Sequence, residues 1–476
     1  MCRNERASKN IFSCIAYGKM SEEIMKIIIA GCGRVGTVIA AQLVNEHHDI
    51  TVIDSDEDTI KYMNDNFDVL TVEGDAASAD VLMEAGAMNS ELLIAVTDSD
   101  AVNLLICVVA KKLGVANTIA RSRNPIYSKT INIIKEEMGL SFVVCPERDT
   151  AKEVLRSLLF KGAGQVETFA KGNHEVMTFV VKEQNPICDI YIRDLSKFIN
   201  RRILVCAVKR DKDILIPRGD FKIQANDTIS FVASRADAIA FFRKMKYETG
   251  KIKSLTIIGG GILGFYLADM AIANGILVRM IDKDRNVCEE LNERLPAAEI
   301  RCGDATDTAV LEECGVFETS AVVTATDSDE TNVVLSMYIA KNCPDTKVVT
   351  KIKKSDFEEM LYGINLGNVI NPKYVAADRI ITYVRAMQAT VGNEVQSLCH
   401  VIDNKVEVLE FKIDKATDGL DIAIQDLKIR RNVLLASITR RGESFIPGGN
   451  DCIQLGDTVL VITTETGIGR FAEIFA

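Results

Sequence analysis

The sequence predicts an α/β protein that contains two copies of one arrangement, a doubly wound parallel-sheet domain followed by a small α+β domain. Three observations predict this fold class. Short runs of Ile, Val and Leu alternate with helical segments, which is typical of a parallel sheet covered on both faces. A glycine-rich turn follows the first apolar run, and this turn and its neighbouring motifs return in the second half of the chain. The chain is therefore predicted to be a tandem duplication.

The composition excludes several classes of protein. The chain has 476 residues, a formal net charge of −11 and a pI of about 5.2. This acidic balance argues against a nucleic-acid partner and against electrostatic docking on anionic lipid. The 13 cysteines include no Cys-x-x-Cys pair, and the four histidines do not complete the spacing of a zinc site. Because no run reaches about 18 apolar residues, we expect a soluble cytoplasmic protein with reduced thiols.

The N-terminal segment, residues 1–24, has no continuous apolar stretch and no clear periodicity. A strand, KIIIA, begins directly after Met25. We expect residues 1–24 to be an extension, which arises from an upstream start codon or forms a disordered tail. A short docked segment is the alternative.

The internal repeat extends over nearly the whole remaining chain. The segment GCGRVG, Gly31–Gly36, recurs as GGGILG, Gly259–Gly264, and 259 − 31 = 228. VIDSD, GDA and TDSD recur between them as MIDKD, GDA and TDSD. Near the end, Asp227 recurs as Asp457, and 457 − 227 = 230. Such steady spacing indicates a gene duplication with few insertions.

The first part of each copy, 25–150 and 251–378, alternates strands with helices. In the first copy we expect a strand at KIIIA, a helix at RVGTVIAAQLVN and a strand at DITVID. DVLTVEG, LLIAV and NTIARS supply further strands with helices between them. This order predicts a Rossmann-like parallel sheet with helices on both faces.

The second part of each copy, 151–250 and 379–476, has a different pattern. Each begins with a connecting helix. The first is DTAKEVLRSLLF, from Asp149, and the second is DRIITYVRAM, in which Ile380 and Val384 lie on one helical face. That face belongs to an ordinary core helix or to a dimer seam. Stretches such as VMTFVV, ILVCAVKR and DTISFVAS, with the turns PRGD and PGGN, predict a small α+β domain.

The glycine loops carry the strongest functional signal. Gly31 permits a tight turn, Gly33 lets a pyrophosphate approach the backbone, and Gly36 permits close helix–strand packing. The exposed amides at the start of the following helix then hold the phosphate charge. The alternative is a Rossmann-like fold with one degenerate, empty site.

Acidic residues at the ends of the next strands are candidates for ribose and adenine recognition. Asp54 and Asp282 are placed to accept hydrogen bonds from ribose hydroxyls, and their charge disfavours NADP. Asp75 and Asp304 follow the third strand, where a carboxylate can take the adenine amino group or cap the following helix.

Residues at the ends of the fourth and fifth strands face the same edge of each sheet. Thr97-Asp98 and Thr326-Asp327 are candidates for the second ribose or a phosphate, and turn or cap chemistry is the alternative. Arg121 and its counterpart Lys351 could reach the phosphates or act as solvated surface charges. Exchange of a guanidinium for an ammonium predicts different phosphate recognition in the two copies.

Signals for catalysis are missing from the sequence. We find no Ser/His/Asp or Cys/His grouping and no paired acids tied to one site. Each nucleotide fold is followed by only about 80 residues, too few for the substrate domain of a dehydrogenase. Two nucleotide folds, two small domains and no catalytic group favour a sensor.

The motifs AGCGRVG, VIDSD, VEGDA and VTDSDAVN, within a duplicated whole, resemble the RCK (KTN) family over residues 25–476. The resemblance implies RCK-N, RCK-C, RCK-N and RCK-C domains in tandem, with NAD, NADH, ATP or ADP bound by the N-type domains. It also implies a ring of eight such modules, supplied by a homotetramer, at the cytoplasmic face of a separate potassium-translocating membrane subunit of the Trk type. The chain is then a non-enzymatic, peripheral regulatory subunit that gates potassium uptake.

The resemblance assigns nucleotide contacts to matching positions in the two copies, and no catalytic or metal-binding residue. The positions are Gly31, Cys32, Gly33, Arg34, Val35, Gly36, Asp54, Asp75, Ala76, Thr97, Asp98 and Arg121, and Gly259, Gly260, Gly261, Ile262, Leu263, Gly264, Asp282, Asp304, Ala305, Thr326, Asp327 and Lys351.

Two rival functions remain open from the sequence. One is an NAD-dependent oxidoreductase with an unrecognised substrate site. The other is a structural ring whose nucleotide folds are vestigial. The small domains could also bind a further ligand or cation, although no cluster of ligating residues is present in the sequence.

Overall fold

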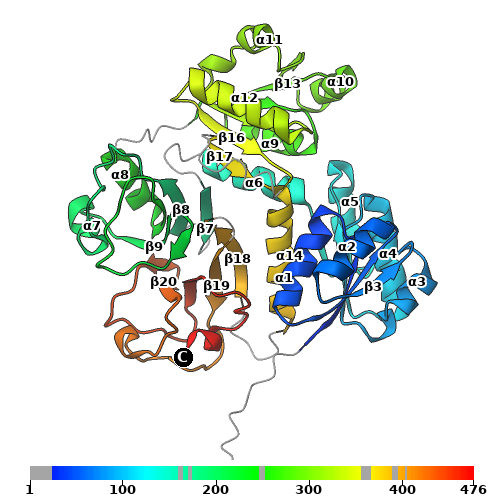
Figure 1. Ribbon diagram of the computed structural model, residues 1–476, viewed down its shortest axis with the longest axis horizontal. Coiled ribbons are helices and arrows are strands. Elements are labelled where there is room, and N and C mark those ends of the chain that lie inside the picture. Colours follow the sequence, from blue (N-terminus) through cyan, green and yellow to red (C-terminus); the bar gives the residue numbers. More distant parts are fainter. Residues whose placement is uncertain are drawn as a thin grey trace, which may run out of the picture.

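Two six-stranded parallel sheets and two five-stranded sheets organise the described part of the chain (Figure 1). The computed structural model describes residues 24–158, 165–169, 174–245, 252–354, 366–388, 395–402 and 405–476. The expected extension, residues 1–24, lies outside the described residues except for Ile24. The duplicated α/β fold with small α+β domains is confirmed.

The first parallel sheet has the strand order β3-β2-β1-β4-β5-β6. Ile27, Ile28 and Ile29 are all buried, because helices cover both faces of the sheet. The elements are β1 (Lys26–Ala30), α1 (Arg34–Asn45), β2 (Asp49–Asp54), α2 (Glu57–Asn66), β3 (Leu70–Glu73), α3 (Ala79–Glu84), β4 (Leu92–Ala95), α4 (Asp100–Leu113), β5 (Asn117–Arg121), α5 (Pro125–Ile134) and β6 (Phe142–Val144).

The second parallel sheet repeats this topology in the order β14-β13-β12-β15-β16-β17. The chain passes from β12 outward to β14 and then returns to β15, so the strand order reverses beside the glycine loop in both sheets. The elements are β12 (Ser254–Ile258), α9 (Ile262–Ala273), β13 (Leu277–Asp282), α10 (Arg285–Arg294), β14 (Glu299–Cys302), α11 (Thr308–Glu313), β15 (Ala321–Thr324), α12 (Asp329–Asn342), β16 (Lys347–Lys351) and β17 (Asn368–Ile370).

The small domains each contain an antiparallel sheet and are entered through a long helix. The first comprises α6 (Pro146–Leu158), β7 (Gln165–Phe169), β8 (His174–Val180), α7 (Ile192–Ile199), β9 (Ile203–Arg210), β10 (Asp213–Leu215), β11 (Thr228–Ala233) and α8 (Arg235–Lys244). The second comprises α14 (Pro372–Gln388), β18 (Val395–Val401), β19 (Val406–Lys412), β20 (Val433–Arg440), β21 (Glu443–Phe445) and β22 (Thr458–Thr463).

The connecting helices α6 and α14 are exchanged between the two halves of the chain. Helix α6 packs on α9 of the second parallel sheet, and Val154 shares a core with Leu267. Helix α14 packs on α1 of the first sheet, and Ile380 shares a core with Ile39 (Figure 1). The apolar faces of both helices are therefore buried within this chain, as expected of core helices.

The two small domains meet through a shared apolar core. Val176 and Cys206 of the first domain lie in one cluster with Val408 and Ile462 of the second. The exchanged helices and this shared core connect all four domains by packing contacts. A movement of one connecting helix would therefore change contacts in both halves of the chain.

A buried charge network joins the first parallel sheet to the second small domain. The Arg385 guanidinium on α14 donates to Glu46, which follows α1, and to Glu407 on β19, at 2.6 and 2.9 Å. His400 on β18 contacts Asp378 of α14 through Nδ1 at 2.6 Å. Burial lowers the pKa of His400, but Asp378 and Glu407 outweigh it and raise the pKa to about 10. The imidazole is therefore charged at neutral pH.

Candidate functional site

The glycine loop after β1 is shaped by two close contacts. Gly31 has φ +93°, and a Cβ there would lie 2.8 Å from the Thr97 amide nitrogen. A Cβ at Gly36 would overlap the carbonyl oxygen of Gly31. Gly259 and Gly264 meet the same constraints after β12. Only glycine fits these positions, because a side chain would separate the helix from the strand.

The middle glycine of each loop faces open space. A Cβ at Gly33 or Gly261 would have no heavy atom within 4 Å. Both glycines are the N-caps of their helices, α1 and α9, and no side chain caps either helix. The first amides of the helix thus remain for an outside acceptor, and the site fits a phosphate group.

The carboxylates at the ends of β2 and β13 hold the glycine loops in place. Asp54 Oδ2 accepts a hydrogen bond from the Cys32 amide at 2.6 Å, and Asp282 Oδ2 accepts one from the Gly260 amide at 2.6 Å. Each carboxylate has further lone pairs, which a ribose diol could use. Burial, with a contribution from Asp54, raises the pKa of the Cys32 thiol to about 12, so this sulfur is not a nucleophile at neutral pH.

Asp75 and Asp304 form turns rather than helix caps. Asp75 accepts from the Ala77 amide and Asp304 from the Thr306 amide, both at 2.9 Å. The N-cap residue of α3 is Ser78 and that of α11 is Asp307. The capping alternative was therefore wrong by three residues. The adjoining Ala76 and Ala305 are buried beneath the turns.

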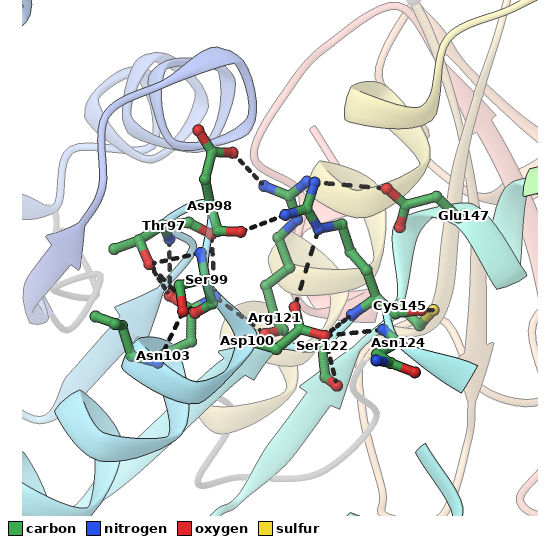
Figure 2. Close-up of polar contacts among 12 residues, drawn as sticks. Thr97, Asp98, Ser99, Asp100, Asn103, Arg121, Ser122, Asn124, Cys145 and Glu147 are labelled. Atoms are coloured by element: carbon green, nitrogen blue, oxygen red, sulfur yellow. Dashed lines mark hydrogen bonds and ion pairs between the residues drawn. The ribbon is translucent and has the colours of Figure 1, made fainter. Parts of the chain in front are cut away.

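Asn103 on α4 organises the ends of β4 and β5. Its Oδ1 accepts from the Thr97 amide and hydroxyl at 2.8 and 2.7 Å, and its Nδ2 donates to the Arg121 carbonyl at 3.0 Å (Figure 2). Asn332 makes the same contacts with Thr326 and Lys351. These contacts bring the predicted residues from two strands to one edge of each sheet.

Arg121 lies between two acids in the first copy (Figure 2). Its guanidinium is 3.9 Å from Asp98 Oδ1 and 3.9 Å from Glu147 Oε1. Arg121 Nε and Glu147 Oε2 are buried and have no hydrogen-bond partner within the described parts of the chain. Burial raises the pKa of Glu147, while Arg121 opposes the shift. The guanidinium thus retains donor capacity for an anion.

The second copy treats its basic residue differently. Lys351 donates to the Ala325 carbonyl at 2.9 Å, and burial followed by repulsion from Lys353 lowers its pKa to about 8. Lys353 forms the ion pair with Asp327, at 2.9 Å. The expected difference between Arg121 and Lys351 is therefore also a difference in their partners.

A cavity of about 860 Å³ lies between the two parallel-sheet domains. Gly33 and Gly261, the open glycines of both loops, line it. In the first copy, the predicted residues Arg34, Val35, Asp54, Asp75, Ala76, Thr97, Asp98 and Arg121 also line it. In the second copy, Ile262, Leu263, Asp327 and Lys351 line it, whereas Asp282, Asp304, Ala305 and Thr326 do not. The cavity therefore extends farther into the first site.

Four charged residues of this cavity are not among those predicted from the sequence. Arg123 and Lys353 follow β5 and β16, and Glu147 and Lys373 are the second residues of α6 and α14. Their equivalent positions in the repeat could have identified them. Because both connecting helices begin at the cavity, a ligand there can act on them directly.

Two negative findings concern only the described residues. No group of three or more His, Cys, Asp or Glu side chains among them could hold a metal ion. No helix within the same ranges is both long enough and apolar enough to cross a membrane.

His48 is buried near the start of β2, away from the cavity, and burial lowers its pKa to about 4.

The fold and the cavity define a duplicated protein in which two Rossmann-like domains share one cavity. Family models match the chain twice each: the TrkA-N domain over 27–146 and 255–372, and the TrkA-C domain over 176–246 and 408–476. The chain belongs to the TrkA family, which confirms the resemblance seen in the motifs.

Curated relatives align with this chain over nearly their full length. The Trk system potassium uptake protein TrkA homolog of Archaeoglobus fulgidus is 30% identical over 451 residues, which cover 95% of this chain and 100% of that protein. The Trk system potassium uptake protein TrkA of Vibrio alginolyticus is 28% identical, over 92% of this chain and 95% of that protein.

Solved structures show the same fold at lower identity. The GsuK channel bound to NAD matches with a TM-score of 0.60 and 17% identity, over 93% of this chain and 77% of that chain. The GsuK RCK domain matches with a TM-score of 0.60 and 16% identity, over 93% of both chains.

Proposed function

We propose that this chain is the regulatory subunit of a potassium uptake system, and that it binds NAD(H) or adenine nucleotides and gates a separate membrane subunit. The observation that carries the proposal is the cavity into which both glycine loops open. The relatives named for potassium uptake and the channel solved with NAD support the same function.

The nucleotide supplies a negatively charged pyrophosphate and ribose hydroxyls; it undergoes no reaction. Helix amides of α1 and Arg121 bind the phosphate charge, and Asp54 holds the loop and accepts from the ribose. Arg121 then shifts its interaction away from Glu147, which belongs to the first turn of α6. Because α6 packs on α9, that shift changes the relation between the two halves of the chain.

The second site is proposed to bind through the amides of α9, Asp282 and Lys351, with weaker phosphate recognition. Lys351 is already bound to the Ala325 carbonyl, and its pKa of about 8 leaves part of it neutral at pH 8. We propose the remaining predicted residues of both sets as nucleotide contacts on the same grounds, with domain limits at 25–150, 151–250, 251–378 and 379–476.

We also propose a ring of eight modules formed by a homotetramer at the cytoplasmic face of a Trk-type membrane subunit. Exposed apolar side chains at the same place in the repeat support it: Leu105 and Val334 are each the sixth residue of their helices, α4 and α12, and are 50% and 64% exposed. Light scattering should give a mass near four times 52.3 kDa. Leu105→Glu with Val334→Glu should lower that mass, and Leu70→Glu, an exposed position outside these helices, should not.

A non-catalytic role is part of the proposal, and an NAD-dependent oxidoreductase is the alternative. Consumption of NADH with any small metabolite would favour the alternative.

The test is the double variant Asp54→Ala with Asp282→Ala, compared with the wild-type chain. NAD affinity measured by calorimetry should fall at least about tenfold, because each change removes a charged acceptor. Nucleotide-dependent potassium flux through the membrane partner should fall with it. Unchanged affinity in the double variant would contradict the assignment of both carboxylates.

A further inference from the structure

Two cysteines adjoin one another beside the second glycine loop. Cys288 is the fourth residue of α10, and Cys302 is the last residue of β14. The Cys288 thiol donates to the Asp282 carbonyl at 3.4 Å, and the Cys302 thiol donates to the next carbonyl, Lys283, at 3.9 Å. In the parallel register, Cys302 is paired with Asp282 itself. Both sulfurs therefore lie at the strand end that carries the proposed ribose acceptor.

The two thiols differ in access. Cys302 is exposed, whereas Cys288 is 4% exposed. Burial, the neighbouring Cys302 thiol and Asp282 raise the pKa of Cys288 to about 12. Cys302 is thus the accessible thiol, and Cys288 is a slow second partner behind it.

We propose that Cys288 and Cys302 form a reversible disulfide that weakens nucleotide binding at the second site. The inference rests on the proposed function for its ligand and on the juxtaposed thiols for its chemistry. The first copy carries Ile60 and Glu73 at the corresponding fourth residue of α2 and last residue of β3, so it lacks the pair.

The oxidant is a low-molecular-weight disulfide such as oxidised glutathione. The Cys302 thiolate attacks one sulfur of the oxidant, the oxidant's S–S bond breaks, and one thiolate leaves and takes up the proton that Cys302 lost. The Cys288 thiolate then attacks the Cys302 sulfur, the mixed disulfide between Cys302 and the small thiol breaks, and the leaving thiolate takes up the proton that Cys288 lost. Two protein thiols are oxidised, and one small disulfide is reduced to two thiols.

The bridge acts on the glycine loop through α10. Gly260 packs closely against α10: a Cβ at this position would lie 2.7 Å from Leu291 and 2.8 Å from Val287, and 3.2 Å from the Asp282 carboxylate. A bond between Cys288 and Cys302 pulls α10 toward β14 and removes the hydrogen bond from Cys288 to the Asp282 carbonyl. The loop and its acceptor carboxylate are displaced together.

The experiment uses the full chain equilibrated in buffers of reduced and oxidised glutathione, with NAD as the probe. Differential alkylation and mass spectrometry should find the Cys288–Cys302 peptide pair. Calorimetry should show that oxidation weakens NAD binding at one class of site at least about fivefold, which is the lower end of typical allosteric coupling. NAD binding at the other class of site should not change. By reciprocity, saturating NAD should shift the disulfide equilibrium by the same factor; a tenfold shift equals about 30 mV.

Two variants give the controls. Cys302→Ser should bind NAD as the reduced wild type does and should lose all response to oxidised glutathione. Cys343→Ser, which changes a half-buried thiol elsewhere in the same domain, should respond like the wild type.

Three results would overturn the switch: no Cys288–Cys302 peptide, a bridge without a change in NAD binding, or an equal response in Cys302→Ser. If the reduced chain bound no NAD, the proposed function would fail and the ligand coupling with it. The mass spectrum would still decide separately whether the bridge forms.

Discussion

Gly33 and Gly36 stand three residues apart in one loop and meet different constraints. A Cβ at Gly36 would overlap the Gly31 carbonyl, so Gly36→Ala should lower the free energy of unfolding by about 3 kcal/mol. Gly33→Ala meets open space at φ −65° and should change it by less than about 1 kcal/mol.

Gly33→Ala, which should have little effect on stability, should have a clear effect on nucleotide binding. The Gly33→Ala methyl group occupies the approach to the helix amides, so NAD affinity should fall about tenfold, or about 1.4 kcal/mol. Thermal melts and calorimetry on both variants check this. A Gly33→Ala chain that folds and binds like the wild type would contradict the phosphate site.

We expect Glu147 to make nucleotide binding at the Arg121 site depend on pH. Its pKa is raised by burial against the opposing effect of Arg121, and Asp100, Arg123 and Lys351 also act on this group. As pH falls, Glu147 takes up a proton and its hold on Arg121 weakens. NAD should therefore bind more tightly at the Arg121 site as pH falls from 8 toward the raised pKa of Glu147, because the pyrophosphate charge of NAD does not change over that range.

Glu147→Gln is the matched control for that pH dependence. This variant should bind NAD more tightly at pH 8 and should lose the pH dependence at the Arg121 site. The second site keeps a dependence of its own, because the Lys351 pKa of about 8 falls within the same range. A Glu147→Gln chain with the wild-type pH profile would exclude the carboxylate as its source.

At this scale the sequence predicted part of the site and missed part of it. Glycine spacing located the loop because backbone geometry admits no other residue at Gly31 and Gly36. The repeat could have pointed to Glu147, but its contact with Arg121 could not be predicted, since it depends on where the start of α6 lies relative to the end of β5. The capping alternative for Asp75 failed because a turn intervenes before α3.

Arg385 on helix α14 forms ion pairs with Glu46, which follows α1, and with Glu407 on β19. Arg385→Met removes the guanidinium from the buried carboxylates Glu46 and Glu407 and leaves, among the described residues, only His400 as a nearby cation, so the free energy of unfolding should fall by about 3–5 kcal/mol. Arg379→Met, at an exposed position on the same helix, should change it by less than about 0.5 kcal/mol. Equal urea midpoints for the two variants would contradict a structural role for the network.

His400 should give this network a pH signature. Its folded-state pKa of about 10 lies above the ordinary value of 6.5, so its stabilisation is complete below pH 6.5. That stabilisation is lost as pH rises through about 10. The stability difference between wild type and His400→Gln should therefore shrink from pH 6.5 to 10. The wild type is compared with the variant because Lys347 and Lys351, whose pKa values are lowered by burial, change the stability of both proteins with pH in the opposite direction. Their contribution cancels in the difference. A flat difference would mean that His400 is neutral in the fold.

Element types followed from sequence more readily than element partners. Apolar alternation and the repeat predicted the parallel strands and both connecting helices. The apolar spacing of Ile380 and Val384 could not reveal that α14 covers the first sheet instead of the second. That choice is made by long-range packing, and helical periodicity contains no information about the partner.

In the molecule as a whole, two copies of one domain pair are interleaved rather than strung in a row. Each connecting helix begins at the shared cavity and is buried against the other half of the chain. A charge bound in the cavity thus acts where both helices start. The duplication was predictable from the sequence, whereas the exchange of helices and the asymmetric cavity were not.

The most direct test of this account is calorimetric titration of the purified chain with NAD, NADH, ATP and ADP, with NADH absorbance followed in parallel. We predict saturable binding in two classes, tighter at the Arg121 site than at the Lys351 site, without consumption of NADH. If none of the four nucleotides bound, the fold would stand and the regulatory function proposed for the cavity would be contradicted.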